Sequence, residues 1–148
     1  MKQALALAEA AYAMDEVPIG CVITLGDKII GMSHNLRNHK KNTLYHAEII
    51  AINQASRHVG DWRLEDCTIY VTVEPCPMCA GAILQARIRR LVYGTASPKA
   101  GAVGSIINLL VNPAFNHQVD VTKGVLETEC RILMSRFFHN LPNKRARL

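Results

Sequence analysis

Apolar residues along the chain follow two alternating spacings, one helical and one strand-like. Apolar positions three or four residues apart predict helices over five segments: 2–13, 46–56, 79–86, 105–111 and 125–138. Short runs of β-branched and apolar residues predict strands over 19–25, 28–33, 68–73 and 90–93. Strands that alternate with helices in this way indicate a layered α/β fold.

Two of the expected strands form a hairpin, and a third lies inside the sheet. Segments 19–25 and 28–33 are separated only by Gly26-Asp27, which is a turn sequence. Segment 68–73 is almost continuously apolar, which is typical of a strand buried on both faces. The polar residues 34–43 and the Gly-, Ala- and Pro-containing residues 94–105 are expected to form loops.

No internal repeat and no linker divides the chain, so residues 1–148 are expected to form one domain. A chain of this size buries about 68–70% of its unfolded surface. No apolar run approaches the roughly 18 residues of a membrane span. The first residues also lack the apolar stretch of a signal peptide. These features predict a cytoplasmic protein with no membrane partner.

Basic residues outnumber acidic ones. Seventeen Lys and Arg stand against twelve Asp and Glu, which gives a formal net charge of +5. The basic residues gather in three short clusters, at 37–41, 87–90 and 144–147. Charge runs are usually solvated surface. This balance nevertheless favours a polyanionic partner such as a nucleic acid.

The five cysteines divide into two kinds. Three lie in apolar surroundings and are expected to be small core residues: Cys21, Cys67 and Cys130. The other two form the segment Cys76-Pro77-Met78-Cys79, where an expected strand passes into an expected helix. Taken alone, this CxxC fits a redox dithiol, half of a zinc ribbon or part of a catalytic zinc site. The N-terminus of a helix lowers a thiol pKa in each case.

A second short motif, His46-Ala47-Glu48, favours the catalytic zinc site. A zinc ribbon needs another CxxC, which the sequence lacks, and a redox dithiol needs no histidine. His46, Cys76 and Cys79 together offer one imidazole and two thiolates as protein ligands. Three ligands leave a fourth position for a water whose pKa falls toward about 7, whereas structural zinc sites are closed by four protein ligands.

Glu48 is expected to act beside such a zinc ion as a proton shuttle. A carboxylate in that place can take a proton from the attacking water and return it to a leaving group. Residues i and i+2 do not share one face of a regular helix. We therefore expect His46 to lie at the start of its helix, where its side chain and that of Glu48 converge on one pocket.

The pattern HxE followed by PCxxC is the signature of the zinc-dependent nucleobase deaminases. Beyond this core, the sequence resembles the bacterial tRNA-specific adenosine deaminases over essentially its whole length. The residues that carry the resemblance are 15–20, Asn35, 46–48, 70–82, 115–117 and 137–138.

The resemblance implies a cytidine-deaminase-like fold, with three α/β/α layers and a central mixed sheet of about five strands. It also implies one zinc ion per chain, a homodimer, and hydrolytic deamination of adenosine to inosine at the wobble position of a tRNA anticodon. The anticodon stem–loop is then the expected partner, in agreement with the basic clusters.

The resemblance also implies which residues bind the substrate. Asn35 would hold the base or its ribose, and Val17 and Phe138 would form apolar walls around the nucleotide. Ala47 belongs to the same set, and Ser97 lies in the loop expected to meet the ribose–phosphate chain. Local roles also fit: an Asx turn for Asn35, loop packing for Val17 and core packing for Phe138.

Two other functions fit parts of the pattern. Guanine deaminase, a free-base deaminase, shares the PCPMC segment in some members, although the basic clusters and residues 115–117 and 137–138 count against it. A non-catalytic, zinc-bound RNA-binding subunit would lack the glutamate that is present here as Glu48. Release of inosine or ammonia from an anticodon hairpin, compared with free guanine, separates these hypotheses.

The sequence departs from the family in places that bear on RNA contacts. Tyr45 stands where a small residue is expected, and Ala102-Val103 where small residues or Cys are common. Ser97 replaces a frequent Asp or Asn. An Asp there could accept a hydrogen bond from the ribose 2′-OH, which marks RNA. With Ser97 we expect weaker discrimination against DNA, so adenine in single-stranded DNA is a further candidate substrate. Cytosine is another, because the same chemistry works at its C4.

Overall fold

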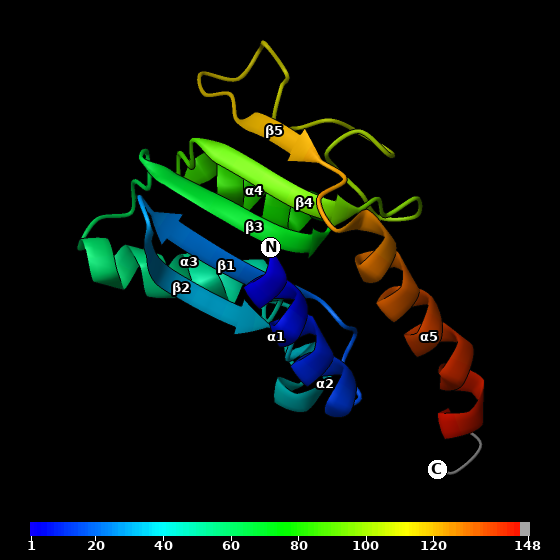
Figure 1. The fold of residues 1–148 in the computed structure, drawn as a ribbon. Coiled ribbons are helices and arrows are strands. Elements are labelled where there is room, and N and C mark those ends of the chain that lie inside the picture. The colour runs from blue at the N-terminus through cyan, green and yellow to red at the C-terminus, as the bar shows by residue number, and fades with distance from the viewer. Residues whose placement is uncertain (146–148) are drawn as a thin grey trace.

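The computed structural model describes residues 1–145, with side chains as far as Leu141. Its centre is a sheet of five strands in the order β2-β1-β3-β4-β5 (Figure 1). The strands are β1 (Gly20–Leu25), β2 (Lys28–His34), β3 (Cys67–Val73), β4 (Arg90–Thr95) and β5 (Asp120–Lys123). The helices are α1 (Lys2–Ala13), α2 (Arg37–Lys40), α3 (Ala47–Val59), α4 (Pro77–Gln85) and α5 (Glu127–Arg145).

The sheet is mixed. β1 runs antiparallel to both of its neighbours, β2 and β3, whereas β3, β4 and β5 are parallel. β2 therefore points the same way as β3, and the carboxyl ends of four strands meet at one edge. Val73 pairs with Thr95 at that edge, and Gly20 pairs with His34. Segments that follow or precede these residues are thus brought together where α/β sheets usually bind ligands.

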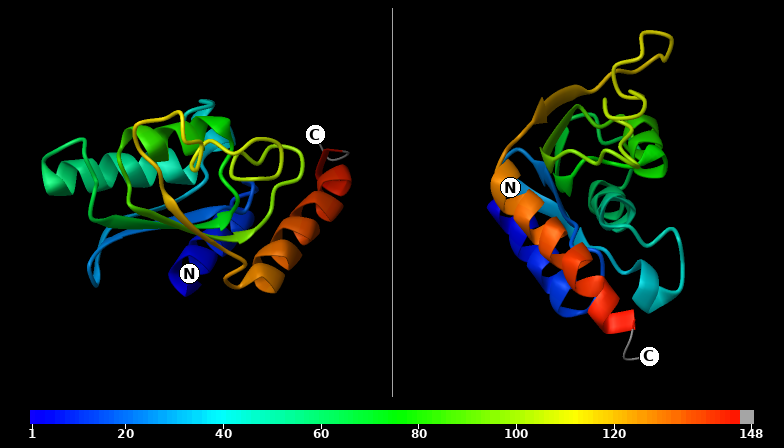
Figure 2. Two further views of the ribbon diagram at one scale, coloured as in Figure 1. Left: turned by 90° about the horizontal axis from the view of Figure 1, so that it is seen from above. Right: turned by 90° about the vertical axis from the view of Figure 1, so that its right-hand side faces the viewer.

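Helices cover both faces of the sheet. α1 and α5 lie on one face, and α3 and α4 lie on the other (Figure 2). This arrangement confirms the three α/β/α layers and the mixed sheet of five strands that the sequence predicted. Within residues 1–145, none of the helices combines the length and the hydropathy needed to cross a membrane.

Small residues let two helices approach the sheet closely. The buried residues of α1 are Ala4, Ala8 and Ala11, and α3 buries three alanines in the same way. A Cβ on Gly20 of β1 would overlap the carbonyl oxygen of Ala4. A Cβ on Gly31 of β2 would lie 2.5 Å from the carbonyl oxygen of Ala51 in α3, which is also too close. A side chain at either glycine would push a helix away from the sheet.

Most predicted elements are present, with ends that shift by a few residues. The helix predicted from residue 79 starts at Pro77, because proline suits the first turn of a helix. The helix predicted over 125–138 is α5 and continues to Arg145. The three cysteines expected in the core, Cys21, Cys67 and Cys130, are buried.

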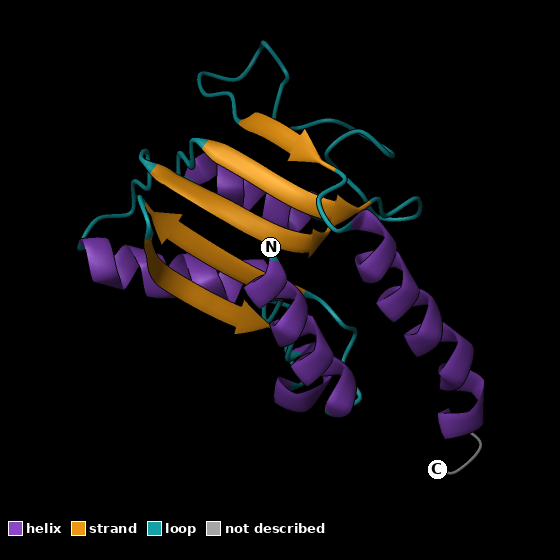
Figure 3. Ribbon diagram, in the orientation of Figure 1, coloured by secondary structure: helices purple, strands orange, loops and turns teal. Residues whose placement is uncertain are grey.

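The helix predicted over 105–111 is wrong. Residues 96–119 form an irregular loop between β4 and β5, with one isolated bridge between Val103 and Asn108 (Figure 3). Gly104 has a φ of +129°, outside the helical region, and its N–H donates to the carbonyl of Ile107. The apolar residues do not share one buried face, since Leu110 is buried whereas Ile106 is exposed. The apolar residues of this segment are spaced as in a helix, but they make separate contacts within an irregular loop.

Two short elements were not predicted from the sequence. β5 reads Asp-Val-Thr-Lys, which has no alternating apolar pattern, and it forms the edge of the sheet by pairing with β4 alone. α2 lies inside the polar segment expected to be a loop, and none of its residues is buried. Both elements depend on partners that are distant in the sequence.

Candidate active site

Two helices begin at the carboxyl edge of the sheet, each at a residue of the predicted zinc site. His46 is the N-cap of α3, with φ −77° and ψ 149°, and Cys76 is the N-cap of α4, with φ −72° and ψ 172°. Neither side chain caps its own helix through a hydrogen bond. His46 therefore lies at the helix start, as expected, with its ring available to other partners.

The three predicted ligands converge. His46 Nδ1 lies 3.5 Å from Cys79 Sγ and 3.7 Å from Cys76 Sγ. One ligand atom of each residue falls within 4.8 Å of the others, and no second group of this kind occurs among the described side chains. Zinc bonds of about 2.3 Å to sulfur and about 2.0 Å to nitrogen, at tetrahedral angles, separate the two ligand atoms by about 3.5 Å. The donor set therefore fits a tetrahedral metal ion.

Hydrogen bonds within the cluster divide its protons unequally. The pKa of the Cys76 thiol is lowered to about 4, because Cys79 and then His46 hydrogen-bond to its thiolate. The pKa of Cys79 is raised by its hydrogen bond to Cys76 and by burial. The His46 pKa is raised, chiefly by the hydrogen bond to Cys76. Metal ligands must be deprotonated, so an ion would replace the protons that Cys79 and His46 hold.

The side chain of Glu48 is buried beside this cluster. Its side chain is only 3% exposed, and its Oε2 has no hydrogen-bond partner. Burial raises the pKa of the carboxyl, although a hydrogen bond from its own backbone N–H and, to a smaller extent, His46 and the Cys79 thiol oppose that shift. A buried carboxylate oxygen without a partner is costly. Its position next to three nitrogen and sulfur donors fits a site that is completed by a metal ion and water.

Comparisons with known proteins give the family. A family model described as MafB19-like deaminase matches residues 1–141. The tRNA-specific adenosine deaminase of Bacillus subtilis (strain 168) is 46% identical to this chain over 145 residues, which is 98% of this chain and 90% of that protein. The chain belongs to the bacterial tRNA-specific adenosine deaminases.

Solved structures agree with the fold of this family. A protein from studies of A-to-I editing by tRNA deaminases at the wobble position of transfer RNA has a TM-score of 0.86 and 43% identity, covering 90% of this chain and 96% of its own. The guanine deaminase from Nitrosomonas europaea has a TM-score of 0.76 at 23% identity, covering 92% and 81%. The second likeness shows a shared fold alone, and both confirm the predicted cytidine-deaminase-like architecture.

Four of the five residues predicted to bind the substrate lie at the carboxyl edge of the sheet. Val17 precedes β1, Asn35 follows β2, Ser97 follows β4, and Ala47 is the first residue of α3. Asn35 and Ala47 are buried, whereas Val17 and Ser97 are half-buried. A backbone hydrogen bond from Leu36 to the carbonyl of Tyr45 places Asn35 close in space to the start of α3.

Phe138 is placed differently. Its side chain is 51% exposed on α5 and stands edge-on to Phe137 at 5.4 Å between ring centroids. Phe137 in turn packs edge-on against Tyr12 of α1. The described ring contacts thus join Phe138 to α1 rather than to the cluster, and its role as an apolar wall stays a prediction.

Sequence reasoning missed a buried carboxylate next to the cluster, that of Glu74. It follows β3 directly and accepts hydrogen bonds from the backbone N–H of Ser97, Val103 and Ser105 at 2.9–3.0 Å. The Ser105 hydroxyl donates a fourth hydrogen bond. Glu74 thereby holds the loop that carries Ser97. The available signal was an acid placed between an almost continuously apolar strand and Pro75, where the carboxylate needed hydrogen-bond partners.

A second missed carboxylate, Glu16, lies beside Val17 and is also buried. It accepts a hydrogen bond from the Asn35 amide nitrogen at 3.1 Å. This bond commits the Asn35 side chain to a residue 19 positions away, rather than to the Asx turn that was the local alternative. The acid between Asp15 and Val17 carried no periodic signal that could have revealed it.

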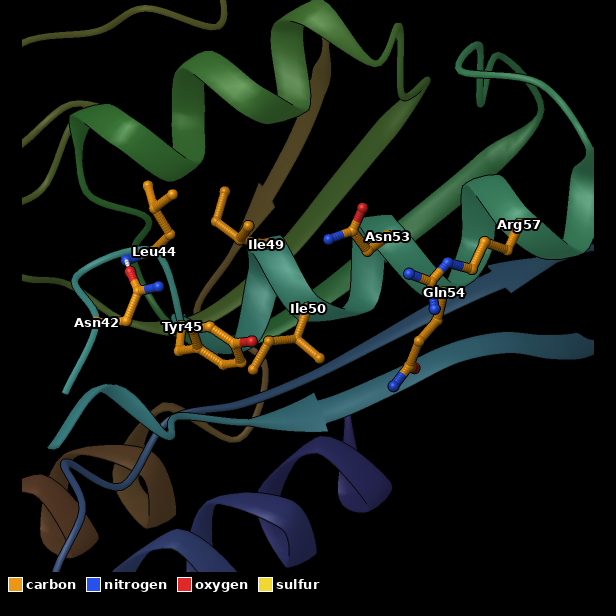
Figure 4. A pocket seen from close by; sticks show the side chains of 8 residues that line it. All are labelled: Asn42, Leu44, Tyr45, Ile49, Ile50, Asn53, Gln54 and Arg57. Carbon is orange, nitrogen blue, oxygen red and sulfur yellow. Dashed lines mark hydrogen bonds between the residues drawn. The ribbon is translucent and has the colours of Figure 1, made fainter. Parts of the chain in front are cut away.

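A groove on the outer side of α3 lies next to His46 in the chain but does not contain the cluster. It encloses about 360 Å³ between residues 42–45 and α3 (Figure 4). Its lining residues are Asn42, Leu44, Tyr45, Ile49, Ile50, Asn53, Gln54 and Arg57. Leu44 is exposed at its rim, so the groove has an apolar part open to solvent.

Proposed function

We propose that this chain deaminates adenosine to inosine in tRNA, at the wobble position of the anticodon. The observation that carries the proposal is the cluster of His46, Cys76 and Cys79 with the sealed Glu48 beside it. The 46% identity between this chain and the tRNA-specific adenosine deaminase of Bacillus subtilis (strain 168) supports tRNA as the substrate. The reaction consumes one water, replaces the 6-amino group of the purine with oxygen, and releases ammonia.

His46, Cys76 and Cys79 would hold one zinc ion per chain, as the nitrogen–sulfur distances support. When bound with three protein ligands, zinc activates water as a nucleophile near neutral pH. The buried positions of Cys79 and of the neighbouring Glu48 would exclude bulk water from one side of the site. This single zinc-dependent deaminase domain would comprise residues 1–148.

Glu48 would carry protons between water and the base. Its raised pKa follows from burial, and Oε2 is free to accept. As a base, the carboxylate takes a proton from the attacking water. As an acid, it delivers that proton to N1 of the purine, and it then transfers the second proton of the water to the departing amino group.

The base would enter at the carboxyl edge of the sheet, between Asn35 and the start of α3. Asn35 would bind the base or its ribose, with Val17 and Ala47 against the ring. Ser97 would meet the ribose–phosphate chain, and Phe138 would close the pocket from α5. The positions of the first four at one edge support this arrangement.

An assay of product release tests the proposal. Purified zinc-loaded protein is incubated with an anticodon stem–loop that carries a wobble adenosine, and separately with free guanine. We expect inosine and ammonia from the stem–loop and no ammonia from guanine. Ammonia from guanine alone would favour the free-base alternative, and release from neither would favour a non-catalytic RNA-binding subunit. The guanine deaminase likeness rests on 23% identity and gives that alternative no support beyond the fold.

Single-stranded DNA would be a weaker substrate. The Ser97 backbone is fixed by Glu74 at 2.9 Å, so residue 97 has a defined place in its loop. A neutral hydrogen bond from Ser97 to a 2′-OH is worth only about 0.5–1.5 kcal/mol. We expect measurable deamination of adenine in DNA, and a higher RNA-to-DNA rate ratio in the Ser97→Asp variant. An unchanged ratio in matched hairpins would show that residue 97 does not discriminate.

The enzyme would work in the cytoplasm as a homodimer. Exposed apolar side chains such as Leu44, beside the groove along α3, support a surface that a second copy covers. Sedimentation velocity at micromolar concentration tests this, and Leu44→Glu is expected to shift the protein toward the monomer. A monomeric wild type would contradict the dimer.

A further inference from the structure

Glu16 is a buried acid whose charge no described cation balances. Its side chain is 0% exposed. Among the described residues the ion pair is between Arg63 and Asp61, and none involves Glu16. Burying a carboxylate is expensive unless hydrogen bonds satisfy it. The hydrogen-bond donors around the Glu16 carboxylate must therefore compensate the cost of its burial.

Those partners come from one segment, immediately after β2. Glu16 Oε2 accepts hydrogen bonds from the Asn35 amide nitrogen at 3.1 Å and from the Asn38 backbone N–H at 3.2 Å. Oε1 accepts from the His39 backbone N–H at 2.6 Å. One carboxylate thus joins the side chain of Asn35 to the first turn of α2.

The bond to Asn35 fixes which way its amide points. A carboxylate only accepts hydrogen bonds, so the NH₂ end of the amide must face Glu16. The Oδ1 end is then turned away from Glu16, and one amide hydrogen remains. Asn35 is 4% exposed, so it has little freedom to choose another orientation. Glu16 sets the donor and acceptor pattern that Asn35 presents.

The bonds to Asn38 and His39 hold a basic segment in place. Residues 37–41 carry Arg37, His39, Lys40 and Lys41, all exposed. The N–H groups in the first turn of a helix have no partner within it, and here Glu16 supplies one. Leu36, which directly precedes this segment, donates its backbone N–H to the carbonyl of Tyr45 at 3.0 Å, and Tyr45 precedes His46. The basic segment therefore begins close to the start of α3, where His46 lies.

We propose that Glu16 is a positioning residue that orients Asn35 toward the base and, with the same carboxylate, docks the basic segment 37–41 against the RNA backbone. The proposal rests on the function proposed above. According to this proposal, the negative charge of Glu16 increases the affinity for RNA, although RNA is itself a polyanion. A negative charge that acted only through the overall field would weaken RNA binding, whereas Glu16 strengthens it.

Two variants that each remove one negative charge test whether Glu16 increases RNA affinity. Glu16→Gln and Glu9→Gln each remove one negative charge, and Glu9 is exposed on α1. For Glu16→Gln we expect KM for the anticodon stem–loop to rise at least about tenfold, as loss of charged hydrogen bonds implies. The slope of log affinity against log salt should fall by about one for each phosphate that the variant no longer binds. Glu9→Gln should leave both quantities unchanged, and zinc content should stay at one per chain in both variants.

Glu16→Asp provides a second route if the Gln variant does not fold. It keeps the buried charge but is one methylene shorter, so it cannot reach all three donors. We expect an intermediate rise in KM with the full number of zinc ions. A KM and a salt slope equal to wild type in the folded variant would overturn the proposal.

A double-mutant cycle separates positioning from general stability. If Glu16 acts partly through Asn35, Glu16→Gln should raise KM much less in an Asn35→Ala background than in wild type. Full additivity would contradict the link to Asn35. A wild-type protein that is inactive on the stem–loop would instead refute the proposed function, so the two failures can be told apart.

Discussion

Cys79 differs from the other two candidate ligands because it lies within the first turn of α4 and is completely buried. We predict that Cys79→Ala loses zinc and activity together, since two remaining ligands hold zinc poorly. Metal content measured by mass spectrometry, together with inosine release, checks this. The matched control is Cys67→Ala, a buried core cysteine, which should keep its zinc. Activity of the wild type after complete chelation would contradict the metal assignment.

Glu48 should be separable from the metal, because it is assigned a proton transfer rather than a bond to zinc. We predict that Glu48→Ala keeps zinc near the wild-type level while turnover falls at least about 10²-fold, the low end for general acid–base catalysis. Single-turnover rates and metal content measured on the same sample decide the point. Zinc loss in this variant would mean that Glu48 is itself a ligand.

Residues with local signatures could be predicted, and residues with distant backbone partners could not. The metal ligands could be predicted from residue type and spacing, and the structure brings together the ligand atoms of His46, Cys76 and Cys79. Glu16 and Glu74 bind backbone N–H groups from loops far away in the sequence, and backbone groups leave no trace in residue types. The predicted roles of Val17, Asn35, Ala47, Ser97 and Phe138 stay predictions.

At the scale of elements, the loop after β4 depends on Glu74 much as α2 depends on Glu16. Burial would raise the Glu74 pKa, but hydrogen bonds from Ser105, Ser97 and Val103 outweigh it and lower the pKa below the ordinary value of 4.5. A lowered folded-state pKa means that Glu74 stabilises the fold above pH 4.5. This contribution is lost as the pH falls through the lower, folded-state value.

We predict that Glu74→Gln lowers the free energy of unfolding by about 1.5–3 kcal/mol at pH 7, as loss of a charged acceptor implies. The amide nitrogen of Gln would also face backbone N–H donors. The difference from wild type should shrink in acid below pH 4.5, the ordinary pKa of this carboxyl. Urea denaturation in zinc-free buffer at several pH values measures it, with the exposed Glu65→Gln as control. An equal loss at every pH would contradict the hydrogen-bonding account.

Elements were predictable where their apolar pattern is also their packing pattern. α1 and α3 bury alanines at helical spacing, and β3 is apolar because it lies in the middle of the sheet. The apolar residues of 105–111 have helical spacing without a common buried face, so the prediction of a helix was wrong. β5 escaped notice because an edge strand of four residues needs no alternation.

At the scale of the whole molecule, positive charge should govern RNA affinity. We predict that binding of an anticodon stem–loop weakens steadily as salt rises, because bound phosphates release counterions. Truncation after Leu141 removes Lys144, Arg145 and Arg147, whose side chains lie outside the described residues. Affinity should fall and zinc content should not. A full-length variant with these three residues changed to Gln controls for helix length. Unchanged affinity in both would exclude the tail from RNA binding.

The pairing of the first helix with the last has a consequence for the order in which the protein is made. The hydrogen bond from Asn140 of α5 to the Tyr12 hydroxyl of α1 spans 128 residues. A chain is synthesised from its N-terminus, so this contact must wait until α5 has been synthesised. His46, Cys76 and Cys79 leave the ribosome well before α5. A nascent chain can therefore gather its three metal-binding side chains while the sheet face shared by α1 and α5 is still half covered.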